Sequence, residues 1–238
     1  MMKSLPFSAG FRLWPVGIIL TAAVLIFAGC STMRQARKSV SELVTPTDVM
    51  LIRYHVREYH ESLLDFTRRL YAKNPKYEKN PASRQQKIRQ IFQGGMPVEF
   101  DFAGKLSHEV LMAAFQQEVP YPDRVYLLSL GLWKSIAEAY NVKDDTLFVS
   151  SLQLPLARLQ RLHHNISQVN WRLKTYRDDA GRLLFLTNEC GEDGYQNMGY
   201  EVIMTRILTR IEDDIYLRGG LPGKYFFNMS TFFATIVI

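Results

Sequence analysis

Residues 49–70 read VMLIRYHVREYHESLLDFTRRL, the most regular pattern in the chain. Its apolar side chains recur every three or four residues, which places them on one face of an α-helix: Val49, Ile52, Val56, Tyr59, Leu63, Phe66 and Leu70. The helix is predicted to begin after Thr47, a suitable N-cap, and to end at Asn74-Pro75. Because three heptads are the lower limit for a coiled coil, the apolar face is expected to pack within a helical bundle.

Helical spacing recurs along the rest of the chain, and further helices are expected at residues 81–93, 107–117, 122–141, 152–173 and 200–217. Residues 122–141 are almost continuously apolar at their start, which indicates a central buried helix, with Gly131 marking close packing against a neighbour. The segment 152–173 matches the first helix in length and period, which favours an antiparallel bundle. The sequence therefore predicts a mainly α-helical, bundle-like domain of five to six helices over residues 47–238.

Two segments have the composition of β-structure. Residues 177–182 read RDDAGR, a turn signal, and strand-like residues 183–187 follow. A β-hairpin with residues 171–177 competes with a continued helix, so a small β element is expected near residues 171–188. The uncharged tail, residues 225–238, is rich in aromatic and β-branched residues and is expected to form a buried strand or a segment packed over the bundle.

The first thirty residues have the organisation of an export signal. Lys3 and Arg12 precede a mostly apolar run, no acidic residue is present, and the run ends in IFAGC at residues 26–30. Ala28 and Gly29 directly before Cys30 resemble the lipobox of bacterial lipoproteins, although Phe27 stands where that motif usually has Leu. The resemblance covers only this segment.

The resemblance implies that residues 1–29 are removed by cleavage between Gly29 and Cys30, and that Cys30 then carries diacylglycerol and an acylated amino group. Residues 30–46 would be the lipidated N-terminus and tether. Ser31, rather than Asp, favours the outer membrane facing the periplasm over the inner membrane. The alternative is an uncleaved transmembrane anchor, because the run to Cys30 approaches the length that a bilayer requires.

Charge is spread unevenly along the chain. Residues 31–95 hold thirteen Lys or Arg against six Asp or Glu, whereas residues 96–238 hold fourteen against seventeen. Basic surface near an anchor suits anionic headgroups or other acidic envelope polymers, or is simply a solvated face. Export argues against a nucleic-acid partner.

Cysteine use excludes an internal disulfide, because only Cys190 remains once Cys30 is lipidated. The acidic residues around Cys190 would raise its thiol pKa, which favours a structural or incidental thiol over a nucleophile.

The candidate metal ligands lie on two predicted helices. His55, Glu58, His60 and Glu61 fall within seven residues, and His55 and Glu58 share a helix face, but the pattern fits no zinc-protease motif. His163 and His164 lie on the helix 152–173 and could reach His55 if the two helices pack together. A hydrophilic helix face is the favoured interpretation, as it is for the acidic run Glu212-Asp213-Asp214.

The sequence contains no motif for a specific reaction, and no cofactor is expected. The favoured hypothesis is a non-catalytic scaffold or accessory lipoprotein that positions a protein partner in the cell envelope. The first alternative is an envelope enzyme or metal-binding protein that uses dispersed His and Glu residues with Cys190. The second is a secretion or assembly component with an exposed aromatic patch that includes residues 225–233.

Overall fold

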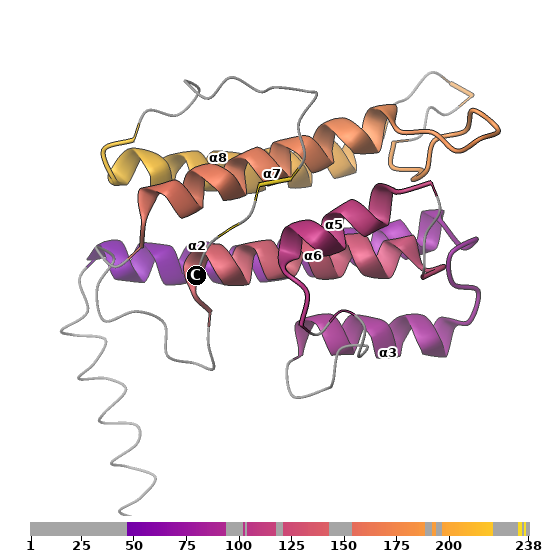
Figure 1. Ribbon diagram of the computed structural model, residues 1–238, viewed down its shortest axis with the longest axis horizontal. Coiled ribbons are helices and arrows are strands. Elements are labelled where there is room, and N and C mark those ends of the chain that lie inside the picture. Colours follow the sequence, from indigo (N-terminus) through magenta and orange to yellow (C-terminus); the bar gives the residue numbers. More distant parts are fainter. Residues whose placement is uncertain are drawn as a thin grey trace, which may run out of the picture. The chain divides into compact units, whose positions relative to one another are not determined.

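The computed structural model describes residues 47–93, 102, 104–117, 121–142, 154–188, 192–193, 197–220, 233–234 and 236. Within these residues lie six helices (Figure 1): α2 (Thr47–Lys73), α3 (Pro81–Phe92), α5 (Ser107–Phe115), α6 (Arg124–Tyr140), α7 (Leu156–Thr175) and α8 (Gly199–Leu217). The mainly α fold class is confirmed. None of these helices is long and apolar enough to cross a membrane. The predicted signal, the tether and Cys30 lie outside the described residues.

Four of the helices form a closed ring. Both α2 and α7 pack against α6 and α8, while α3 lies on α2 and α6, and α5 lies on α6 and α7. The chain direction reverses from α2 to α6, from α6 to α7 and from α7 to α8 (Figure 1). This is an up-down-up-down four-helix bundle. The two helices of matched period, α2 and α7, occupy opposite corners of the ring and run in the same direction.

The periodic face of α2 is fully used in the core. All seven of its predicted apolar residues are buried, and Ile203, Ile207, Ile211 and Ile215 of α8 are buried as well. The helix α6 is central, as predicted, because it contacts four other helices and is buried over most of its length. Helix α7 begins at Leu156 rather than at residue 152, since Pro155 supplies its extended N-cap.

Gly131 is a point of close approach between α6 and α5. A Cβ atom at this position would lie 2.8 Å from the Cγ and Cδ2 atoms of Leu111 and 3.1 Å from its backbone nitrogen. Leu111 is completely buried, so it has little room to move. The close packing predicted for Gly131 is therefore confirmed.

Gly131→Ala is expected to lower the free energy of unfolding by about 1–3 kcal/mol because the added methyl overpacks this contact. The helix propensity of alanine, about 1 kcal/mol better than that of glycine, would act in the opposite direction. Urea denaturation followed by circular dichroism measures the balance. Gly104→Ala is the matched control, since no heavy atom lies within 4 Å of its added Cβ. Equal or greater stability of Gly131→Ala would contradict this account of the α5–α6 contact.

Of the two alternatives for residues 171–177, the continued helix forms: α7 extends to Thr175, and no strand forms among the described residues. The turn itself exists: Asp178 N donates to Arg182 O at 2.8 Å, and one antiparallel bridge joins Arg177 and Leu183. Residues 171–175 are helical because Arg172 and Leu173 extend the buried face of α7.

Side-chain amides hold the extended segments that follow the turn and that end the chain. Asn74 Nδ2 donates to Leu186 O, and Leu186 N donates to Asn74 Oδ1, at 2.9 and 2.8 Å. Asn165 makes the same pair with the backbone of Ala234, at 2.9 and 2.7 Å. The described tail residues Phe233 and Ile236 are buried against the bundle without forming a strand. Most of the predicted tail element lies outside the described residues.

Candidate functional site

His55 lies inside the bundle and faces α8. Its Nδ1 atom is 2.9 Å from Oδ1 of Asp214, and both side chains are buried. Asp214 Oδ2 also accepts hydrogen bonds from Tyr140 at 2.5 Å and from Tyr59 at 3.5 Å. The hydroxyls of Tyr59 and Tyr140 are 3.1 Å apart. One carboxylate thus connects α2, α6 and α8.

The two tyrosines that donate to Asp214 keep their protons because they are buried. Burial is the largest cause that raises the pKa of Tyr59 and Tyr140 well above 10, and the charge of Asp214 adds to it. Both hydroxyls therefore remain protonated and able to donate. Because Asp214 and both tyrosines are closed off from solvent, the arrangement is suited to fixing three helices together.

The other candidate residues of α2 contact different neighbours. Glu58 Oε2 is 2.9 Å from Arg210 NH2 on α8. His60 Nε2 is 2.7 Å from the carbonyl oxygen of Phe92 in α3, and Glu61 is exposed. Within the described ranges, no three His, Cys, Asp or Glu residues converge as metal ligands. The sequence cluster is thus divided between the α8 side and the α3 side of α2.

The condition under which His163 or His164 could reach His55, packing of their two helices, is not met, and His163 contacts another residue. His163 Nε2 is 2.9 Å from Glu212 Oε1, so His163 and His55 contact two different carboxylates of α8. They are separated because α2 and α7 stand at opposite corners of the ring. His163 and His164 instead belong to a surface hollow.

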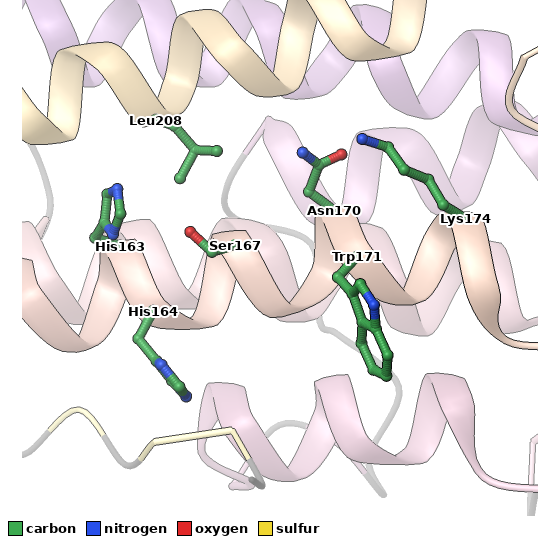
Figure 2. A pocket seen from close by; sticks show the side chains of 7 residues that line it. All are labelled: His163, His164, Ser167, Asn170, Trp171, Lys174 and Leu208. Carbon is green, nitrogen blue, oxygen red and sulfur yellow. The ribbon is translucent and has the colours of Figure 1, made fainter. Parts of the chain in front are cut away.

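The hollow, called here the α7–α8 groove, has a volume of about 320 Å³. Figure 2 shows its lining side chains: His163, His164, Ser167, Asn170, Trp171, Lys174 and Leu208. Six of them come from one side of α7, because residues three and four apart share a helix face. Leu208 of α8 lies across from them, while His164 and Trp171 extend from α7 away from α8 (Figure 2).

Paired charges border the groove. Lys174 Nζ is 2.6 Å from Glu201 Oε2 at one end, and the His163–Glu212 pair stands toward the other end. Between them lie the polar Ser167 and Asn170 together with the half-buried Trp171 and Leu208. Such a surface can hold a side chain that is partly apolar within a polar border. No local pattern in the sequence indicates this groove, because Leu208 comes from a distant helix.

No protein-family model, no curated protein and no solved structure matches this chain.

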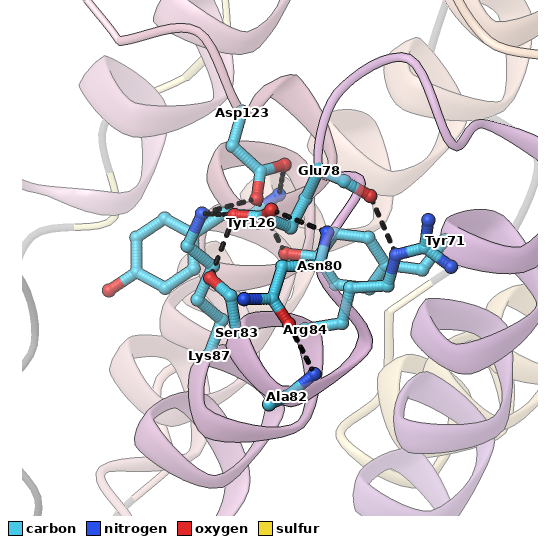
Figure 3. A network of polar contacts seen from close by, with 9 residues as sticks. All are labelled: Tyr71, Glu78, Asn80, Ala82, Ser83, Arg84, Lys87, Asp123 and Tyr126. Carbon is cyan, nitrogen blue, oxygen red and sulfur yellow. Dashed lines mark hydrogen bonds and ion pairs between the residues drawn. The ribbon is translucent and has the colours of Figure 1, made fainter.

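A second polar network joins α3 to the main bundle (Figure 3). Lys87 Nζ is 2.8 Å from Glu78 Oε2 and 2.9 Å from Asp123 Oδ2, and Tyr71 donates to the same Asp123 oxygen at 2.9 Å. The Asp123 Oδ1 atom caps α6 by accepting from Tyr126 N. The hydrogen bond from Lys87 is the main cause that lowers the pKa of Glu78 to about 2. The residues of this network lie on separate elements, which suits a structural role.

A further hollow of about 450 Å³ lies beside the turn that follows α7. Lys73, Lys76 and Arg182 give it a basic lining, and the exposed Leu186 forms part of its wall. Cys190, Gly29 and Cys30 lie outside the described residues.

Proposed function

We propose that the protein is a bacterial envelope lipoprotein whose helical bundle serves as a non-catalytic scaffold or accessory subunit for a protein partner. The residues Ala28-Gly29-Cys30 after an apolar run support anchoring through acylated Cys30. Ser31 supports the outer membrane, with the domain facing the periplasm. In this proposal, residues 30–46 link the lipid to the bundle.

The α7–α8 groove is the observation that carries the partner-binding part of the proposal. Tryptophan is enriched among the residues that contribute most to protein–protein binding, and such residues sit within a polar rim. Trp171 lines the groove on the side away from α8, and the His163–Glu212 and Lys174–Glu201 pairs border it on the α8 side.

The metal-binding or catalytic alternative receives less support from the same contacts. His55 is enclosed with Asp214, Glu58 pairs with Arg210, and His163 pairs with Glu212. These side chains already have partners and point to different parts of the bundle. A shared cleft would require them to converge.

Trp171→Ser is expected to reduce recovery of the partner at least tenfold when the protein is purified from mildly solubilised membranes, because a tryptophan that anchors an interface contributes about 2 kcal/mol or more. The partner is defined as a protein that copurifies stoichiometrically with the unaltered chain. Val202→Ser is the matched control, since Val202 is exposed on α8 and does not line the groove.

Thermal unfolding of each variant establishes that the bundle is intact before recovery is compared. Equal recovery with Trp171→Ser and Val202→Ser would reject the groove as the binding surface. Isolation of the unaltered chain alone, under the same mild conditions, would count against the scaffold itself.

A further inference from the structure

Four exposed apolar or aromatic side chains lie at one end of the bundle, and three others, Leu186, Met198 and Val202, lie at the other end. Met50 and Tyr54, in the first turns of α2, are 51% and 44% exposed, and Tyr216 and Leu217, in the last turn of α8, are 67% and 55% exposed. The His55–Asp214 contact pairs the start of α2 with the end of α8. Figure 1 shows these two helix ends on the same side of the bundle. We call residues 47–57 and 213–218 the α2-start end.

The same end receives the chain from the proposed anchor. Only residues 31–46 separate Cys30 from Thr47, where α2 begins. The seventeen residue-to-residue steps between them span at most about 60 Å even when fully extended. A short connection of this kind gives the attached bundle a high effective concentration at the membrane that holds the anchor. The first surface of the bundle beyond that connection is the α2-start end.

The side chains at this end match the chemistry of a lipid headgroup region. Tyrosine is enriched at membrane interfaces, where its ring is apolar and its hydroxyl is solvated. The guanidinium carbon of Arg57 lies 5.5 Å from the centre of the Tyr54 ring. Arg53, Arg57 and Arg218 stand at this end against Asp48, Asp213 and Asp214, and Asp214 is buried beside His55. The formal charges of this end therefore balance, and its aromatic and apolar side chains carry the match to a lipid surface.

We propose that the α2-start end docks onto a lipid surface, with Tyr54, Tyr216 and Leu217 entering the headgroup region. This inference rests on the proposed lipid anchor at Cys30. Docking would place the loop at residues 177–183 far from the membrane, because that loop lies at the other end of the bundle (Figure 1). The helices would then stand roughly along the membrane normal. The α7–α8 groove, on the side of the bundle, would stay open to a partner.

Fluorescence quenching in vesicles tests this orientation on the full anchored chain. The vesicles contain phosphatidylethanolamine and phosphatidylglycerol, with a nitroxide on a fraction of the headgroups. In a Cys190→Ser background, a single fluorophore is placed by Asp213→Cys or, at the opposite end, by Leu186→Cys. Both positions are exposed. The label at position 213 is expected to be quenched at least threefold more strongly than the label at position 186.

A second comparison isolates the docking residues. Tyr54→Ser with Leu217→Ser is expected to remove most of the quenching at position 213, whereas Met198→Ser with Val202→Ser, an equally exposed pair at the other end, is expected to leave it unchanged. Equal quenching at positions 213 and 186, or no effect of the first pair, would overturn the proposal.

Failure of docking can be distinguished from failure of the anchor. A lipidated Cys30 has no free thiol, so the labelled chain carries one fluorophore. A second fluorophore, on Cys30, would show that the anchor proposal is wrong, whatever the quenching shows.

Discussion

Cys30→Ser is expected to yield a chain that carries no fatty acid and retains residues 1–29. The thioether to diacylglycerol needs the cysteine sulfur, and removal of the signal in lipoproteins follows attachment of the lipid. Metabolic labelling with a palmitate analogue, read on a gel beside an antibody stain, measures both effects. Label is expected to fall to background, and the band is expected to move to the larger precursor size.

Cys190→Ser is the matched control, because it removes the other cysteine of the chain and is expected to change neither label nor size. If Cys30→Ser keeps both the size and the membrane attachment of the unaltered protein, the uncleaved transmembrane anchor is the correct interpretation. Phe27 makes this outcome a real alternative, since it departs from the leucine of the resembled motif.

Asp214→Ala is expected to lower the free energy of unfolding by about 3–5 kcal/mol, as removal of one partner from a buried charged contact does. His55, Tyr59 and Tyr140 would all lose the same acceptor while remaining enclosed. Each unpartnered buried polar group adds to the cost. Urea denaturation followed by helical circular dichroism measures the change.

Asp213→Ala removes the same charge one residue earlier and is the matched control. Asp213 is exposed, so its removal is expected to change stability by no more than about 0.5 kcal/mol. A double-mutant cycle with His55→Ala then gives the share of the loss that belongs to the His55–Asp214 pair. Similar losses for Asp213→Ala and Asp214→Ala would contradict the structural role of the buried carboxylate.

The helices could be predicted from the sequence because their signal is local. Residues such as Leu63 and Ile207 repeat at the helical period, and that period alone places them on an inward face. The turn at residues 177–182 was also visible from composition. The choice between a hairpin and a continued helix could not be made from the local sequence, because the residues that could pair as a strand also complete the buried face of α7.

The pairing of polar side chains could not be predicted in the same way. The run Glu212-Asp213-Asp214 reads as a solvated face, yet Asp214 is buried, Asp213 is exposed and Glu212 meets His163. Successive residues point about 100° apart on a helix, so the three residues of one acidic run face three different environments. Which environment each residue meets depends on helices far away in sequence, and so does the α7–α8 groove.

The amide pairs of Asn74 and Asn165 attach two separate segments of the chain to the helices. Each side-chain amide presents one donor and one acceptor to the N–H and C=O of a single residue, as a neighbouring β-strand would. Buried side chains hold the same segments, namely Leu184 and Phe185 after the α7 turn and Phe233 and Ile236 in the tail. Each amide pair therefore fixes which residue lies against the helix, and opening either segment would also expose apolar surface to water.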